Sequence, residues 1–293
     1  MAVKGKPAPL STLRHRLQGA VVFATLLIGI RHVLPGEGST GGAFDAFCPF
    51  GGVETLLPMI LRGETLRSTN LLNFALLIGV IGVSLLAGRA FCGWLCPLGA
   101  LQDGLAWVAR RLSGEKRHIR GKKSPARFPV QLPARLDRPL RYAKYLVLIG
   151  IAWASLTALY PPLHDLCPVR AVFSFRLVTP LLWSVLLTFV VTSLLVERFW
   201  CKYLCPLGAL LAIANKFAPL RPVVDPARCN KCGRCDVECP MGIVDVHAST
   251  GNAECIRCLE CLETCARQET VTLTLGKPQQ AVLAAADSMS GSD

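Results

Sequence analysis

Near its C-terminus the chain reads Cys229-Asn-Lys-Cys232-Gly-Arg-Cys235-Asp-Val-Glu-Cys239-Pro240, followed by Cys255-Ile-Arg-Cys258-Leu-Glu-Cys261-Leu-Glu-Thr-Cys265. Both runs have the spacing C-x2-C-x2-C-x3-C, which is typical of [4Fe–4S] cluster ligands. Three thiolates two residues apart can wrap one corner of a cubane, while the fourth points at a neighbouring cluster. Structural zinc sites also use C-x2-C pairs, but zinc does not need the third and fourth cysteines at these offsets. A disulfide framework is favoured less still.

The double run resembles the module of two-cluster ferredoxins. The resemblance implies that each cluster takes three cysteines from one run and the last cysteine of the other. The implied ligand sets are Cys229, Cys232, Cys235 and Cys265 for the first cluster, and Cys255, Cys258, Cys261 and Cys239 for the second. Ala266 departs from the pattern, because proline usually stands there. We expect a small α+β electron-relay domain over residues 221–275 and a flexible tail over residues 276–293.

Composition separates this domain from the rest of the chain. Hydrophobic residues make up 52% of the 293 residues, yet the last quarter is polar and rich in cysteine, which predicts a membrane domain over residues 1–220. The formal net charge of +13 could suggest nucleic acid as a partner. No groove-reading element accompanies the basic linker 113–139, so we expect anionic lipid headgroups rather than nucleic acid beside it.

Four apolar stretches predict transmembrane helices, at about residues 17–35, 71–88, 141–160 and 180–197. A bilayer core of roughly 30 Å needs about 20 helical residues, which each stretch supplies with its flanks. The first stretch follows basic residues as in a signal peptide, but no small-residue cleavage site is obvious, so we expect it to be retained. The fold class is therefore a predominantly α-helical membrane protein with four spans.

Basic residues set the expected orientation. The N-terminal tail carries four Lys or Arg and the loop 89–140 carries eleven, whereas the loops 36–69 and 160–179 carry two each. The positive-inside rule places the N-terminus, the loop 89–140 and the ferredoxin domain in the cytoplasm. This side is reducing, as thiolate ligands require. We expect a multi-pass protein of the bacterial inner membrane.

The membrane domain repeats a second cysteine motif. One copy reads Phe91-Cys92-Gly-Trp-Leu-Cys96-Pro97-Leu-Gly-Ala-Leu101 and the other reads Trp200-Cys201-Lys-Tyr-Leu-Cys205-Pro206-Leu-Gly-Ala-Leu210. Because both copies enter from the cytoplasm, the repeat is parallel, with a pseudo-two-fold axis expected along the membrane normal. Cys92 and Cys96 should therefore face Cys201 and Cys205. Proline suits the first turn of a helix, so short helices are expected at 98–109 and 207–218.

The repeated C-x3-C-P also closes the first ferredoxin run, from Cys235 to Cys239. We therefore predict that the membrane motifs hold further iron–sulfur centres. The number of these centres stays open. The alternative is that the motif cysteines are inert small hydrophobic residues at a helix end.

Cys48 and Cys167 stand apart from the twelve motif cysteines, each followed by proline and expected on the outer face. The repeat should bring them together, as a disulfide, as ligands of a cofactor or as unpaired thiols. His32 and His164 lie near the same face and suggest a haem or a quinone headgroup, although interfacial histidines are more often solvated.

The paired Cys-x3-Cys-Pro-Leu-Gly-Ala-Leu motifs, followed by a two-cluster ferredoxin module, resemble the NapH/NosR-type polyferredoxin membrane family. The resemblance runs from about Leu71 to Val271, and the compact architecture is nearer the NapH type. It implies electron transfer between the quinone pool and an extracytoplasmic redox system. A related branch of the family acts as a copper reductase in oxidase assembly.

We accordingly expect an electron carrier or a quinol dehydrogenase-type subunit of a multi-subunit complex. It would relay electrons between its ferredoxin module and the quinone pool or an extracytoplasmic redox partner. Expected cofactors are two [4Fe–4S] clusters, one or more additional clusters and a quinone. The alternatives are a metal-reducing or cofactor-assembly factor, and a thiol–disulfide carrier that uses Cys48 and Cys167. The direction of electron flow stays open, since potential depends on hydrogen bonds to sulfur and on solvent exposure.

Overall fold

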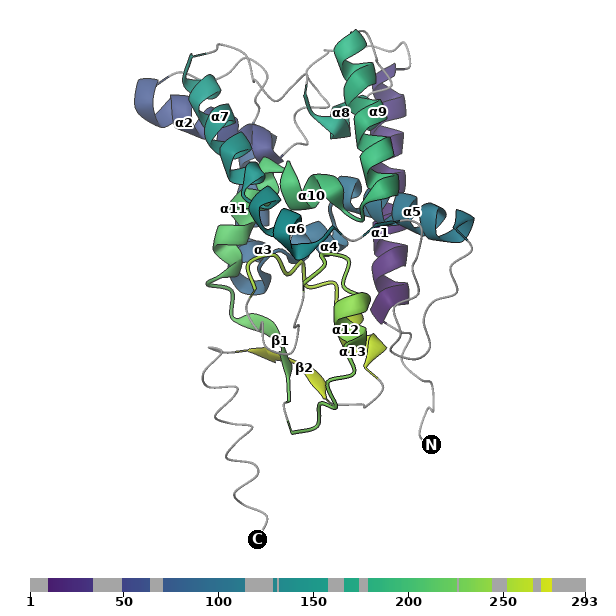
Figure 1. The fold of residues 1–293 in the computed structure, drawn as a ribbon. Helices are drawn as coiled ribbons and strands as arrows, with labels where there is room; N and C mark the ends of the chain where they lie inside the picture. The colour runs from purple at the N-terminus through teal and green to yellow at the C-terminus, as the bar shows by residue number, and fades with distance from the viewer. Residues whose placement is uncertain are drawn as a thin grey trace, which may run out of the picture.

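The computed structural model describes residues 10–33, 49–63, 71–113, 129–130, 132–157, 166–173, 179–225, 227–243, 252–265 and 270–275. These residues form mostly helices, with one small sheet near the C-terminus. Figure 1 shows several of the longer helices above, the short helices in the middle and the cysteine-rich domain below, while the N-terminal helix runs down one side from the upper to the lower level.

The first copy of the repeat lies on five helices. Their bounds are α1 Leu10–Val33, α2 Pro49–Arg62, α3 Leu71–Ala87, α4 Ala90–Trp94 and α5 Pro97–Leu112. The second copy lies on six: α6 Ala134–Leu140, α7 Ala143–Thr157, α8 Pro168–Phe173, α9 Pro180–Leu195, α10 Phe199–Tyr203 and α11 Pro206–Asn215. In both copies a helix starts at the proline of the C-x3-C-P motif, as predicted.

The cysteine-rich domain is held together by a two-stranded sheet. Its elements are β1 Leu220–Val224, α12 Arg234–Val237, α13 Glu260–Thr264 and β2 Val271–Leu275. The strands are antiparallel and pair Leu220 with Leu275 and Val224 with Val271. This pairing joins the start of the domain to its end, so the two cysteine runs are brought back beside one another.

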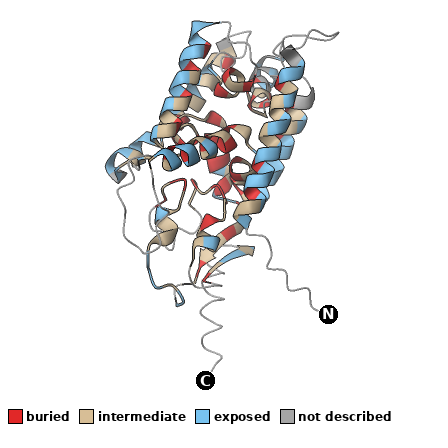
Figure 2. Cartoon of the chain, turned by 90° about the vertical axis from the view of Figure 1, so that its right-hand side faces the viewer, coloured by how far each residue is buried: buried red, intermediate tan, exposed pale blue. Residues whose placement is uncertain are grey.

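The long helices turn apolar side chains outward. Ile78 on α3, Trp153 on α7 and Leu187 on α9 are about two-thirds to three-quarters exposed, at 70%, 72% and 66%. Figure 2 shows long helices with exposed residues, in pale blue, along their outer faces and the buried residues gathered around the middle of the molecule. Exposed apolar side chains along several long helices are typical of a membrane-facing region.

Within the described residues, α1 is the one helix long and apolar enough to cross a bilayer, over Leu10–Arg31. The helices at the other three predicted spans, α3, α7 and α9, have 17, 15 and 16 residues. A crossing needs about 20 residues.

Helix α1 also differs from its predicted span, because it begins at Leu10 rather than near residue 17. Its first turns are tied to the protein interior: Arg14 and Gln18 are buried and bond to the cysteine-rich domain and to the first repeat motif. Hydropathy alone ends the apolar stretch at these polar residues, so it predicts a later start for the helix.

Candidate iron–sulfur sites

The first cysteine set lines one hollow at the surface of the cysteine-rich domain. Cys229, Cys232, Cys235 and Cys265 surround this hollow of about 470 Å³, which opens to solvent. Cys232 is exposed, and the other three are partly buried. Lys231 and Gly233 have positive φ values of 52° and 70°, which turn the backbone sharply on both sides of Cys232. This turn directs the cysteines of one run to the same hollow.

The second cysteine set lines a neighbouring hollow of about 610 Å³. Its lining includes Cys239, Cys255, Cys258 and Cys261. The same turn occurs here, since Arg257 and Leu259 on either side of Cys258 have φ values of 52° and 62°. A left-handed leucine costs roughly 1–2 kcal/mol, so the fold retains this turn against a local preference. Cys235 lines both hollows, which are therefore adjacent.

The donor chemistry of both hollows fits iron–sulfur clusters. Burial, and then neighbouring cysteines, raises the pKa of Cys258 well above its usual value and that of Cys261 to about 12. Several thiolates can share such a site only if a cationic centre compensates their charge, as cluster iron does. Among the described residues, no three Cys, His, Asp or Glu side chains converge on one metal ion. A cubane instead takes one thiolate at each iron corner.

The four repeat cysteines meet in the middle of the molecule. Cys92 and Cys201 are buried in α4 and α10, while Cys96 and Cys205 precede the first residues of α5 and α11. Burial, and then Cys201 and Cys92, raises the pKa of Cys96 above its usual value. The pKa of Cys205 is likewise raised, by burial first and then by the other three cysteines. The four thiols therefore lie close to one another.

Hydrogen bonds to sulfur occur at this four-cysteine site. The amide of Gln102 on α5 donates to Cys201 Sγ at 3.1 Å, and the backbone N–H of Gly208 donates to Cys205 Sγ at 3.3 Å. Gln102 Oε1 also accepts from the backbone N–H of Trp200 at 3.0 Å. Donors of this kind stabilise negative charge on sulfur.

The four-cysteine site touches the second hollow through backbone. A Cβ atom placed on Gly93, between Cys92 and Cys96, would lie 2.4 Å from the carbonyl oxygen of Ile256. Beside it, the indole N–H of Trp94 donates to the carbonyl of Arg257 at 2.9 Å. Cys92 and Ile256 also belong to one hydrophobic core, against which the cysteines of the second hollow pack: Cys239, Cys255 and Cys258.

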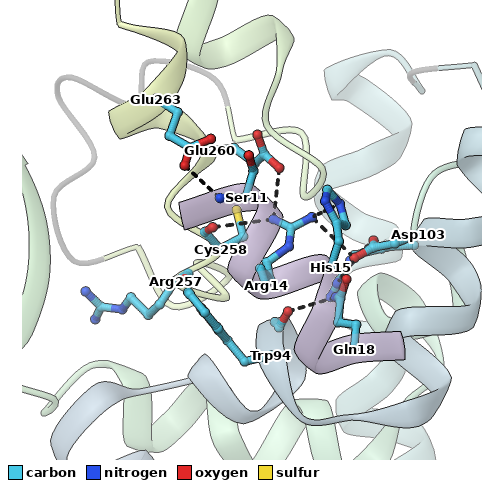
Figure 3. Close-up of polar contacts among 12 residues, drawn as sticks. Ser11, Arg14, His15, Gln18, Trp94, Asp103, Arg257, Cys258, Glu260 and Glu263 are labelled. Atoms are coloured by element: carbon cyan, nitrogen blue, oxygen red, sulfur yellow. Dashed lines mark hydrogen bonds and ion pairs between the residues drawn. The ribbon is translucent and has the colours of Figure 1, made fainter. Parts of the chain in front are cut away.

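Helix α1 closes the other side of this junction, as Figure 3 shows. Arg14 pairs with Glu260 at 3.1 Å and with Asp103 at 3.5 Å, so it bridges the cysteine-rich domain and α5. Gln18 donates to the carbonyl of Gly93 at 3.0 Å, and the backbone N–H of Ser11 donates to Glu263 at 2.6 Å. The start of α1 is thus a clamp across the two parts.

Sequence reasoning missed two buried arginines, Arg89 and Arg198, which are fully buried beside the four cysteines. A signal was present, because each stands three residues before the first cysteine of its copy.

The structure describes only one of the two cysteines expected on the outer face, Cys48 and Cys167. Cys167 lies partly buried just before α8, while Cys48, His164 and the side chain of His32 lie outside the described residues.

Two protein-family models match the chain. The one described as "4Fe-4S binding domain" matches twice, at residues 69–115 and 178–223. The one described as "4Fe-4S dicluster domain" matches residues 221–266. No solved structure matches.

Curated relatives share much of the chain. YccM of Escherichia coli K12, named for electron transport, is 31% identical over 81% of this chain and 65% of its own length. The uncharacterized protein MJ0750 of Methanocaldococcus jannaschii is 31% identical over 74% of this chain and 82% of its own. The ferredoxin-type protein NapH of Haemophilus influenzae is 27% identical over 71% and 72%.

The chain thus spans slightly less than two thirds of YccM, but most of MJ0750 and NapH. The matched families bind [4Fe–4S] clusters, and the named relatives are electron-transport and ferredoxin-type proteins. With two cysteine runs, paired Cys-x3-Cys-Pro motifs and these relatives, the chain belongs to the NapH/NosR-type polyferredoxin family of iron–sulfur electron-transfer proteins.

Proposed function

We propose that this protein relays electrons, one at a time, between its ferredoxin module and the quinone pool or an extracytoplasmic redox partner. The observation that carries the proposal is the contact of Gly93 with Ile256, because it joins α4, which contains Cys92, to the segment between Cys255 and Cys258. Bound clusters would supply the single-electron chemistry. The chain supplies ligands, spacing and electrostatic environment.

Three sets of cysteines would hold the clusters. The first is Cys229, Cys232, Cys235 and Cys265; the second is Cys239, Cys255, Cys258 and Cys261; the third is Cys92, Cys96, Cys201 and Cys205. For the third set we propose one shared centre rather than one for each motif. The contacts between the two motifs support a shared centre, because Gln102 of the first copy donates to Cys201 Sγ of the second, and Arg198 of the second donates to the carbonyl of Cys92.

The exposure of the three sets suggests their order in the relay. Cys232 of the first set is exposed, so a soluble redox partner can approach there. The second set lies between the first set and the membrane motifs, since Cys235 lines both hollows and Cys258 shares a core with Cys92. The third set is the most buried. Electrons would therefore pass through the sets in this sequence, in either direction.

We further propose that α1, α3, α7 and α9 cross the bilayer as the four predicted spans. The exposed apolar side chains of these helices support this arrangement. In it, residues 1–220 form the membrane domain, residues 221–275 form the ferredoxin module, and the N-terminus and this module face the cytoplasm. The two copies of the repeat would be related by an axis along the membrane normal, with the third set close to that axis.

The relay is tested by reoxidation of the dithionite-reduced chain in vesicles, followed by absorbance after a quinone is added. A Cys92→Ser/Cys201→Ser variant should reoxidise at least tenfold more slowly with quinone than the unaltered chain. Ferricyanide, a soluble acceptor able to approach Cys232, should oxidise both proteins at similar rates. Equal quinone rates in the two proteins would contradict the proposed path through the third set.

A further inference from the structure

Two buried arginine side chains lie at the four-cysteine site. Arg89 and Arg198 are completely buried and are the largest fully buried side chains among the described residues. They occupy the same position in the two copies, three residues before Cys92 and Cys201 respectively. Charged side chains are almost never fully buried unless they are paired, so this placement needs a reason.

Each arginine bonds to the cysteine of the other copy. Arg198 Nη1 donates to the carbonyl oxygen of Cys92 at 2.9 Å. Arg89 Nη2 donates to the carbonyl oxygen of Cys201 at 3.3 Å. The two contacts are reciprocal, although the residues they join are more than a hundred positions apart. Each guanidinium therefore fixes the partner copy's motif relative to its own.

Two glycines make these contacts possible. A Cβ atom on Gly99 would lie 2.7 Å from the carbonyl of Cys92 and 3.4 Å from Arg198 Nη1. A Cβ atom on Gly208 would lie 3.0 Å from Arg89 Nη2 and 3.3 Å from the carbonyl of Cys201. Both glycines belong to the repeated Leu-Gly-Ala-Leu segment. The repeat therefore contains the glycine that leaves space for the guanidinium as well as the arginine itself.

The acids that balance the arginines differ between the copies. Arg198 forms two hydrogen bonds of 2.6 Å with Asp103, whose equivalent in the second copy is Ala212. Arg89 instead pairs at 2.7 Å with Glu254, directly before Cys255, and Glu254 also pairs with Lys144. One arginine is therefore balanced inside the membrane domain, and the other is balanced by the ferredoxin module.

Both guanidinium groups stay charged in this environment. Arginine keeps its proton even in buried sites. Each guanidinium here also lies against a carboxylate, with Glu254 at 2.7 Å from Arg89 and Asp103 at 2.6 Å from Arg198. The two positive charges are thus permanent and act on the sulfurs across a medium of low dielectric.

We propose that Arg89 and Arg198 are positioning residues that hold the two cysteine motifs around one shared centre and raise its reduction potential with their buried charge. The proposal rests on the proposed third centre. A cluster gains negative charge when it is reduced, so a nearby fixed cation favours the reduced form. The symmetry of the contacts implies that each arginine contributes.

Removing opposite charges from the same ion pair separates this role from a merely structural one. In Arg198→Gln the site loses a cation, and the midpoint potential of the third centre should fall. In Asp103→Asn the site loses an anion at nearly unchanged shape, and the potential should rise. We expect each substitution to shift the midpoint potential of the third centre by about 59 mV, in opposite directions. This shift corresponds to a tenfold change in a one-electron equilibrium. A purely structural pair would give no shift, or shifts of one sign.

The measurement is an EPR-monitored redox titration of the anaerobically purified full chain, with Arg89→Gln expected to behave like Arg198→Gln. Arg110→Gln is the matched control, because Arg110 pairs with Glu197 at 3.2 Å but is 40% exposed. Its third-centre potential should equal that of the unaltered chain. Unchanged potentials in Arg198→Gln and Asp103→Asn, or shifts of the same sign, would overturn the proposal.

Loss of the centre is also informative. If Arg198→Gln lacks the third signal while both ferredoxin signals persist, Arg198→Lys should restore it, which supports the positioning role, and Asp103→Asn alone then decides the charge role. A lysine variant that also lacks the signal overturns the charge-based account. If the unaltered chain itself has no third signal, then the proposed centre fails together with this inference.

Discussion

At the scale of single residues, Gly93 decides how closely the two parts of the molecule approach. It has no side chain where a Cβ atom would meet the backbone of Ile256 at 2.4 Å, a separation that cannot be relieved by a rotamer change. Trp94 donates to the carbonyl of Arg257, and Gln18 donates to the carbonyl of Gly93 itself. The close approach is therefore held by hydrogen bonds on both sides of Gly93.

We predict that Gly93→Ala weakens the docking of the ferredoxin module by about 1–3 kcal/mol, the usual cost of overpacking. Limited proteolysis of the cluster-loaded chain should then cleave between residues 215 and 230 several times faster. Gly104→Ala is the matched control, because nothing lies within 4 Å of a Cβ atom at Gly104 on α5. Equal cleavage rates for both variants would argue against this account of the junction.

A second prediction at this scale concerns Gln102, whose amide donates to Cys201 Sγ. Gln102→Leu places in the first copy the residue that Leu211 provides at the equivalent position of the second. The sulfur loses a donor, so the potential of the third centre should fall, while the two ferredoxin potentials should stay within error. A redox titration checks this, and equal third-centre potentials would contradict it.

At the scale of elements, the helices could be predicted where local chemistry decides them. The prolines at positions 97 and 206 begin α5 and α11, and apolar runs give α3, α7 and α9. The start of α1 could not be predicted in the same way. Arg14 and Gln18 are stabilised by Glu260, Asp103 and the Gly93 carbonyl, which lie more than seventy residues away.

Arg14→Gln tests the clamp formed by α1. The substitution removes the ion pair of Arg14 with Glu260 and its weaker ion pair with Asp103. Breaking a buried ion pair costs roughly 3–5 kcal/mol. Thermal unfolding of the purified chain should therefore begin several degrees lower. Arg16→Gln, an exposed neighbour on the same helix, should leave the unfolding curve unchanged. Similar curves for both variants would show that the clamp is unimportant.

At the scale of the whole molecule, the sequence predicts which cysteines form a set, but it does not predict the contacts that join one set to another. The spacing within each cysteine run is local. The prediction that the cysteines of the runs 229–239 and 255–265 are cluster ligands therefore follows from the pattern and the ferredoxin resemblance. The contact of Arg89 with Cys201 joins residues 112 positions apart, and that of Trp94 with Arg257 joins residues 163 apart. Single-sequence patterns contain no direct signal for such pairs.

The proposed topology makes a prediction about Cys48. If the loop 36–69 faces outward, a membrane-impermeant maleimide added to intact cells should label Cys48 from outside once the cells are treated with a reductant. The label should persist in a Cys167→Ser variant and be lost in a Cys48→Ser/Cys167→Ser variant, which serves as the control. Labelling of Cys48 only after the cells are broken open would reverse the proposed orientation.

The most direct test of the account is the amount of iron and acid-labile sulfide in the anaerobically purified chain, with EPR spectra of the reduced protein. Three clusters predict about twelve iron atoms per chain, four for each [4Fe–4S] cluster. Replacing Cys92, Cys96, Cys201 and Cys205 with serine should reduce this to about eight and remove one EPR signal. A content of about eight in the unaltered chain, unchanged by the replacement, would contradict the shared centre.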